Sequence, residues 1–271
     1  MLKTRVITAI IIATLGLLAV FMMNATAFSA LAGALLLAAG GWEAARLAGL
    51  QARWSQLIYP TALIGMGVLI HIIQPQLPIT LWLLPGCAVW ALFLPWLAVP
   101  GWGRADIGTH RTIKLIGLGV LLLSAWLALS WLQARDPWLV LLLLIIIAGA
   151  DVGAYFTGRR IGGPKLAPSI SPGKTRSGAI GGLVCAMVLT AIAAWLIPTS
   201  PFSPLLAGAL ALGLALLSIG GDLFISLLKR QRGIKDSSKL LPGHGGVLDR
   251  FDSLGAALPF FAIAVALWGS Y

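Results

Sequence analysis

The chain has 271 residues, of which 59% are hydrophobic and only 10% are charged, and its mean hydropathy is +0.97. Soluble domains carry about 25% charged residues, so this composition excludes a soluble domain and indicates an integral membrane protein. The formal net charge of +11 could suggest nucleic-acid binding, but the placement of the basic residues explains it without a nucleic-acid partner.

Apolar runs of membrane-spanning length recur along the whole chain. A helix needs about 20 residues to cross the hydrocarbon core of a bilayer. The fold class predicted is therefore all-α, a polytopic membrane protein of about nine transmembrane helices in one integral domain over residues 1–271. The predicted spans are 6–23, 26–44, 57–73, 79–99, 113–132, 138–156, 179–197, 204–228 and 254–270.

The first span has two interpretations. Lys3 and Arg5 precede an apolar run, and the sequence ATA at 25–27 resembles a signal-peptide cleavage site. The run is longer than the 7–15 residues typical of a signal core, which favours a retained helix. Cleavage stays open as the second interpretation, and it would not change the sidedness of later spans.

The basic residues predict the orientation. With the amino terminus in the cytoplasm, 18 of the 19 Lys and Arg residues fall on the cytoplasmic side and only Arg135 lies outside. Cytoplasmic connections of membrane proteins are enriched in Lys and Arg, which also contact anionic membrane lipids. We therefore expect a cytoplasmic (inner) membrane protein with its carboxyl terminus outside and its site facing the cytoplasm.

Two aspartates lie within predicted spans near the cytoplasmic edge. Asp151 precedes Arg159 by eight residues, about 12 Å along a helix, and Asp222 precedes Lys229 by seven, about 10 Å. Membrane depth and the negative carboxyl end of the helix dipole both disfavour a carboxylate there. Such acids indicate a functional site, unless each forms an ion pair with a neighbouring Lys or Arg that holds the bundle together.

Helical spacing extends these acids into polar stripes. Ser218, Asp222, Ser226 and Lys229 share one helix face, as Asp151, Tyr155 and Arg159 do on another helix. Each stripe is typical of a cavity wall.

Two more acids, Asp249 and Asp252, lie three residues apart at the start of the last span. A purely structural interpretation of this pair is an N-cap followed by an acid that the helix dipole favours.

Carboxylates facing clustered Lys and Arg predict a site for Mg²⁺ and phosphates together. The sequence PGHGG at 242–246 is a tight turn whose N–H groups could approach an anion, with His244 able to exchange a proton; the same glycines would also suit a plain re-entrant turn. SPGKT at 171–175 is not a phosphate-binding P-loop, since Pro168 replaces the required glycine. It predicts a turn that presents Lys174, Ser171 and Thr175 at the start of a helix.

The stretch SLLKRQRGIKDSSKLLPGHGGVLDRFDS, from Ser226, resembles the signature of the phosphatidate cytidylyltransferases, or CDP-diacylglycerol synthases. ADVGAYFTGRRIGG, followed by KLAPSISPGKT, is similar to a second region of that family. The two cover about 150–255, so the catalytic half is predicted over about 145–257.

The resemblance implies a membrane enzyme that condenses CTP with phosphatidate, using Mg²⁺, to give CDP-diacylglycerol and pyrophosphate. Members of that family are often dimeric, so a homodimer is one partner that the resemblance allows. The same resemblance implies roles for individual residues. The expected catalytic set is Asp222, Lys229, Asp249 and His244. The expected phosphate-binding set is Lys174, Arg230, Lys235, Ser171, Thr175 and Arg250, and the expected metal ligands are Asp222, Asp249, Asp252 and Asp151.

Three positions depart from the family pattern. Arg176 and Ser177 stand where the family usually has Trp followed by Glu or Gln, and Ile225 stands where it often has Glu. A loss of acidic or amide groups predicts altered metal affinity or nucleotide preference, or an inactive relative. Three further functions stay open from the sequence, namely a different CTP-using lipid-phosphate enzyme, a lipid-alcohol kinase and an ion-coupled transporter.

Overall fold

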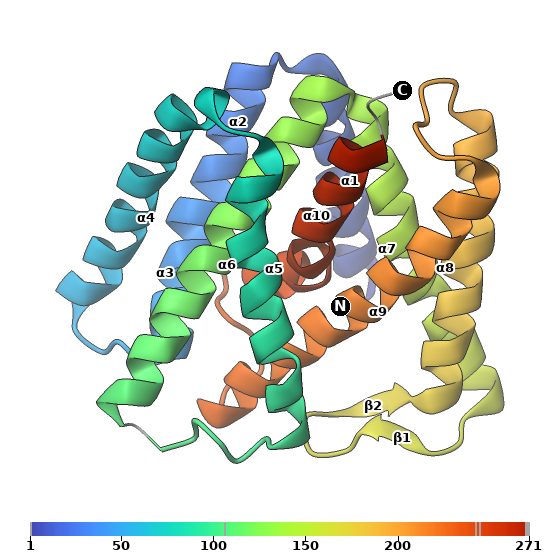
Figure 1. The fold of residues 1–271 in the computed structure, drawn as a ribbon. Coiled ribbons are helices and arrows are strands. Elements are labelled where there is room, and N and C mark those ends of the chain that lie inside the picture. Colours follow the sequence, from blue (N-terminus) through green and yellow to red (C-terminus); the bar gives the residue numbers. More distant parts are fainter. Residues whose placement is uncertain (1, 106, 242, 244, 269–271) are drawn as a thin grey trace.

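The computed structural model describes residues 2–105, 107–241, 243 and 245–268 (Figure 1). Within these residues the chain is helical apart from one short hairpin, which confirms the predicted all-α membrane fold. The elements are α1 (Leu2–Met22), α2 (Ala25–Gly33), η1 (Ala34–Gly40), α3 (Gly41–Ala48), α4 (Arg53–Ile73), η2 (Gln74–Gln76), α5 (Ile79–Phe93), η3 (Pro95–Ala98), α6 (Gly108–Arg135), α7 (Pro137–Ile161), β1 (Lys165–Ala167), β2 (Ser171–Thr175), α8 (Arg176–Leu196), α9 (Pro204–Gln231) and α10 (Leu248–Trp268).

Every predicted span corresponds to a helical run. Among the described residues, eight runs are long and apolar enough to cross a membrane, and α1 adds the shorter apolar stretch Ile10–Met22. The second run is longer than predicted, because α2, η1 and α3 continue without a break and η1 is π-helical. The last helix begins at Leu248, before the predicted residue 254, so its first turns carry the acids expected near the site.

Local sequence fixes where the long helices α7 and α9 begin. The side chain of Asp136 accepts a hydrogen bond from the Trp138 N–H at 2.9 Å, and Ser203 caps α9 in the same way through Leu206. Proline follows each cap, where its missing N–H costs nothing and its fixed φ suits a first helical turn. These caps fix the helix starts at the end of the bundle opposite the hairpin (Figure 1).

The connections between helices fall at two ends of the bundle. Those after α5 and α7 lie along the lower edge in Figure 1, and those after α3 and α9 begin in its lower half, the last rising into the bundle to reach α10. The connections after α1, α4, α6 and α8 lie along the upper edge. The lower set contains the basic connections of the sequence, and Arg135 ends α6 at the upper edge. The two-sided distribution of charge predicted from the sequence is therefore present in the fold.

Helices α7 and α8 pack at very short range through glycine. A Cβ atom on Gly182 would lie 2.6 Å from the carbonyl oxygen of Ala150, and one on Gly178 would lie 2.9 Å from that of Ala154. Small residues at four-residue spacing let two membrane helices approach this closely. The pair thereby forms a rigid wall, beside which α9 crosses the molecule diagonally (Figure 1).

The connection between α7 and α8 differs from the prediction. SPGKT is not a free turn but strand β2, paired antiparallel with β1 so that Lys165 lies opposite Thr175. The pairing satisfies backbone groups that would otherwise need water at the membrane edge. Thr175 does stand at the start of α8, as predicted, and its hydroxyl accepts the Gly178 N–H at 3.1 Å.

Candidate functional site

A charged cavity of about 620 Å³ opens between α7, α8, the hairpin and α9, at the end of the bundle with the basic connections. Both α7 and the hairpin supply polar groups to it, while α9 contributes Ile219. Its polar lining includes Asp151, Tyr155, Arg159, Lys165, Lys174 and Thr175. The predicted stripe on α7 is therefore a cavity wall, as its spacing indicated.

Lys174 joins the hairpin to α9 through an ion pair with Asp222. The two side chains keep 33% and 27% of their surface exposed, so water and ions can reach the pair. Ser226, one turn further along α9, also faces Asp222, with its hydroxyl 3.5 Å from the carboxylate. The ion pair that the sequence offered as the structural explanation of Asp222 is present, at a position where a substrate anion could exchange for the carboxylate.

Asp252, near the start of α10, has its carboxyl group beside that of Asp222. Asp151 on α7 is close enough to Asp222 and Lys174 to interact electrostatically with both. Carboxyl groups this close repel each other unless a proton or a cation lies between them. Three of the four predicted metal ligands, from α7, α9 and α10, thus influence one another electrostatically, and their role as ligands stays a prediction.

The fourth, Asp249, stands in a different environment. Its Oδ1 accepts a hydrogen bond from Lys229 at 2.6 Å, and only 10% of the lysine and 6% of the aspartate side chain is exposed. Its Oδ2 accepts from the Ser237 N–H at 2.8 Å and the Gly246 N–H at 2.9 Å. Both carboxylate oxygens are occupied by protein donors, so the geometry favours Asp249 as an organiser of the loop before α10.

The remaining predicted phosphate contacts that the structure describes are not among the residues that line this cavity. Arg230 bonds the Ile170 carbonyl through Nε at 3.3 Å and so ties the end of α9 to the hairpin. Lys235 and Arg250 are exposed, and Ser171 is half-buried at the start of β2. His244 lies outside the described residues, and its predicted role stays a prediction.

A buried acid that the sequence reasoning missed, Glu43 on α3, belongs to the same region. Its carboxylate has no exposed surface and accepts hydrogen bonds from Ser237, Ser238, Val247 and Leu248. A signal for it existed, because Glu43 falls inside a predicted span, where any ionisable residue indicates function or a partner.

The three departures from the family pattern lie elsewhere. Ile225 is 4% exposed in the hydrophobic core, and Arg176 is exposed at the start of α8. Ser177 donates a hydrogen bond to the Gly162 carbonyl and lines a different cavity. None of the three is among the residues that line the charged cavity, although the Ser177 hydroxyl lies 3.2 Å from that of Thr175, which does line it. The predicted effect on metal affinity stays a prediction.

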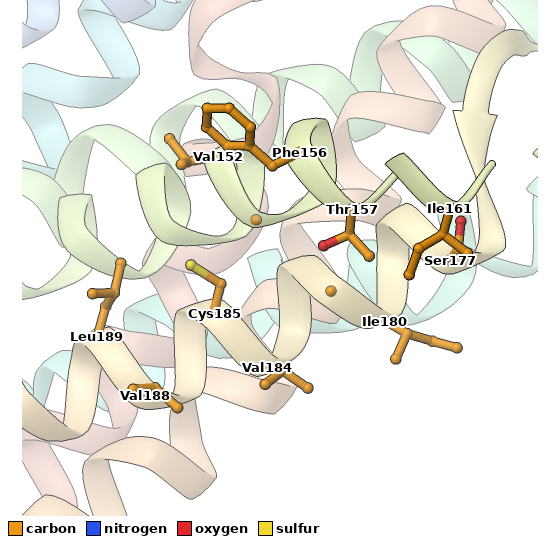
Figure 2. A pocket seen from close by; sticks show the side chains of 12 residues that line it. Val152, Phe156, Thr157, Ile161, Ser177, Ile180, Val184, Cys185, Val188 and Leu189 are labelled. Atoms are coloured by element: carbon orange, nitrogen blue, oxygen red, sulfur yellow. The ribbon is translucent and has the colours of Figure 1, made fainter. Parts of the chain in front are cut away.

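That other cavity, of about 700 Å³, lies on the opposite face of the α7–α8 pair (Figure 2). Phe156, Val184 and Val188 project along it, with the hydroxyl groups of Thr157 and Ser177 towards one end. Among the described residues that line it there is no Lys, Arg, Asp or Glu. Although larger, it lacks the groups that phosphate chemistry needs, and its surface suits contact with lipid chains.

The donor set around Asp222 fits the needs of Mg²⁺. The described residues contain no cluster of three or more His, Cys, Asp or Glu side chains arranged to hold a metal ion. Mg²⁺ does not need one, because it typically takes one or two carboxylates and completes its shell with water and substrate phosphates. The neighbouring carboxyl groups of Asp222 and Asp252 meet that requirement.

The sequence model of the cytidylyltransferase family matches residues 3–268 of the chain. The phosphatidate cytidylyltransferase of Pseudomonas aeruginosa is 40% identical over 284 residues, covering all of both chains. That of Brucella suis is 37% identical, covering 94% of this chain and 90% of the relative. That of Haemophilus influenzae is 47% identical over 135 residues, 47% of each chain.

Proposed function

The chain belongs to the cytidylyltransferase family, and we propose that this membrane-embedded nucleotidyltransferase condenses CTP with phosphatidate to give CDP-diacylglycerol and pyrophosphate. One observation carries the proposal: Asp151 and Lys174 line one cavity at the basic end of an apolar bundle, and Lys174 forms an ion pair there with Asp222. A water-soluble nucleotide and a lipid phosphate can meet only at such an edge. The family's full-length match supports this choice over a kinase or a transporter.

We propose Mg²⁺ as the cofactor, held by Asp222 and Asp252 with Asp151 beside them. When bound, the ion would neutralise phosphate charge and polarise the phosphoryl group under attack. The chain's own contribution is to keep these carboxylates together on three helices that cannot move apart without breaking the α7–α8 and α9–α10 packing.

The cations of the site would bind the phosphates of the two substrates. Lys174 is part of β2, and Arg230 reaches the same hairpin from α9 through the Ile170 carbonyl. Arg250 adds exposed positive charge near Asp151, and Lys235 adds it in the connection between α9 and α10. Two polyanions repel each other strongly, and fixed cations lower the free energy of bringing them together.

The reaction then needs little proton transfer. A phosphate monoester has a second pKa near 6, so the phosphatidate phosphate is largely a dianion at neutral pH and is already nucleophilic. One of its oxygens attacks the α-phosphorus of CTP, a new P–O bond forms, and the bond to the β-phosphate oxygen breaks. Pyrophosphate leaves with the electron pair of that bond, and Lys174 and Arg230 are placed to hold its charge.

Radiolabel distribution tests the proposal. Purified protein in phosphatidate vesicles should transfer label from [α-³²P]CTP, but not from [γ-³²P]CTP, into the organic phase. Label from the γ position alone would instead identify a lipid kinase, and no lipid label with either substrate would reject CTP-dependent transfer to lipid.

We further propose that the basic end of the bundle faces the cytoplasm of a cell whose inner membrane holds the protein. In a variant lacking Cys87 and Cys185, single cysteines at the exposed positions Gln76 and Thr199 should react with an impermeant reagent in intact cells. One at exposed Lys239 should not, and its labelling would reverse the orientation. We also propose a homodimer, which cross-linking in membranes tests: a cross-linked species of twice the mass of the chain is expected, and its absence would contradict the dimer.

A further inference from the structure

Glu43 presents an unusual arrangement, a fully buried carboxylate whose described donors come from one distant loop. Oε1 accepts the Ser238 hydroxyl at 2.6 Å and the Val247 N–H at 2.9 Å. Oε2 accepts the Ser237 hydroxyl and the Leu248 N–H, both at 2.8 Å. Each oxygen therefore takes one hydroxyl and one backbone donor, which leaves the charge well solvated by the protein without water.

The two backbone donors belong to the beginning of α10. Because α10 starts at Leu248, its first N–H groups have no partner within the helix. A carboxylate near these groups satisfies them and interacts favourably with the positive end of the helix dipole. Glu43 thus caps the start of α10 from another helix, α3, although it lies 205 positions before Leu248 in the sequence.

The same first turn of α10 carries the acids of the site. Ser237 contacts both Glu43 and Asp249, since its hydroxyl also lies 3.0 Å from Asp249 Oδ2. Gly246 closes the arrangement, because a Cβ atom there would collide with the Ser237 hydroxyl and the Glu43 carboxylate. Hydrogen bonds therefore link Glu43 to Asp249 and to the first turn of α10, the helix that also carries Asp252.

We propose that Glu43 is a positioning residue of the enzyme: it fixes the start of α10 and so sets where Asp252 stands relative to Asp222. This inference rests on the proposed function for its catalytic consequence, but its structural part is independent of it. Glu43 itself is not among the residues that line the charged cavity.

The test compares Glu43→Gln with Gln133→Leu in detergent. Glutamine keeps the size of Glu43, but its NH₂ group is a donor and must face the N–H of Val247 or Leu248, which is also a donor. One of these backbone hydrogen bonds is therefore lost. Gln133 is a matched control, a buried amide on α6 that bonds the carbonyls of Val20 and Met23 away from the site. Gly246→Ala disrupts the same hydrogen bonds, because its Cβ atom would collide with the Ser237 hydroxyl and the Glu43 carboxylate. It provides a second variant if Glu43→Gln fails to fold.

Amide hydrogen exchange gives the readout that does not depend on activity. In Glu43→Gln and in Gly246→Ala, exchange at Val247 and Leu248 should rise at least about tenfold, while Gln133→Leu leaves it unchanged. The Mg²⁺ concentration for half-maximal CTP-dependent lipid labelling should rise about 10- to 100-fold in the two junction variants, as is usual when support of a metal ligand is lost.

Unchanged exchange at Val247 and Leu248 in folded Glu43→Gln would overturn the inference. So would a uniform rise across the chain that Gln133→Leu reproduces, because it would indicate general destabilisation. An unchanged Mg²⁺ requirement with faster exchange would overturn the link to Asp252. If wild type labels no lipid while the local exchange effect holds, the proposed function fails and the structural role of Glu43 stands.

Discussion

Lys229 is the residue for which sequence and structure suggest the most different roles, a phosphate contact and the buried partner of Asp249. The N–O separation of 2.6 Å corresponds to roughly 6 kcal/mol of gross attraction at an effective dielectric constant of 20. Desolvation offsets much of this, and removing one partner from a buried pair typically costs about 3–5 kcal/mol. Asp249 keeps its donors from Ser237 and Gly246, which places the expected cost near the lower limit.

The perturbation is Lys229→Met, which keeps the length of the side chain and removes its charge. We expect a loss of about 3 kcal/mol, which for a chain of this size lowers the melting temperature by roughly 6–12 °C. Asp249→Asn should cost a similar amount, because it strands the lysine. The double variant should be less destabilised than the sum of the two by about 2–3 kcal/mol, since neither charge is then left alone.

Thermal unfolding of the four proteins in one detergent, without metal or nucleotide, measures this coupling. Strictly additive losses, or a Lys229→Met variant that melts with wild type, would refute the structural pair and return Lys229 to the phosphate site. Activity of the double variant separates the roles further. If the pair only supports the fold, recovered stability brings recovered turnover with an unchanged KM for CTP.

Three further substitutions probe the exposed part of the site. Asp222→Asn should abolish Mg²⁺-dependent transfer, yet change metal-free stability by less than about 1 kcal/mol, because its ion pair with Lys174 is about one-third exposed; a large melting shift with retained turnover would contradict the metal assignment. Arg230→Ala should lower kcat/KM for CTP and loosen the hairpin, which faster proteolysis would report. Lys235→Ala should raise only the KM for CTP. Arg135→Ala, at the opposite end of the bundle, is the control and should change neither kcat nor KM. Equal losses of activity in Arg230→Ala, Lys235→Ala and Arg135→Ala would indicate a general folding effect.

Hydropathy and charge were sufficient to predict the helical architecture, because bilayer thickness imposes a length on every span and basic residues mark one side. The polar stripe on α7 was also predictable, since a helix fixes which residues share a face. The stripe on α9 proved to have two parts. Asp222 faces the hairpin lysine, whereas Lys229 turns into the junction before α10.

Partners that only the folded chain brings together could not be predicted. Glu43 bonds residues 194–205 positions away, and nothing in its own neighbourhood identifies them. The β1–β2 pairing was missed because β1 spans only three residues and β2 contains Pro172 and Gly173, so neither shows the alternation that predicts a strand. The departure at Ile225 was assigned to the site from a family pattern, but its helix turns that side chain into the core.

The two ion pairs explain how such a site can exist without substrate. Asp222 has the Lys174 cation and Asp249 has Lys229 and two N–H donors, so these two carboxylates are compensated in a medium of low dielectric constant. Exposure then separates their roles. The Lys174–Asp222 pair is open to solvent, so the proposed substrate phosphates could reach Lys174, whereas the Lys229–Asp249 pair is nearly buried and links α9 to α10. In the proposed reaction, the exposed pair would therefore exchange its partners for phosphate while the buried pair keeps the two helices in place.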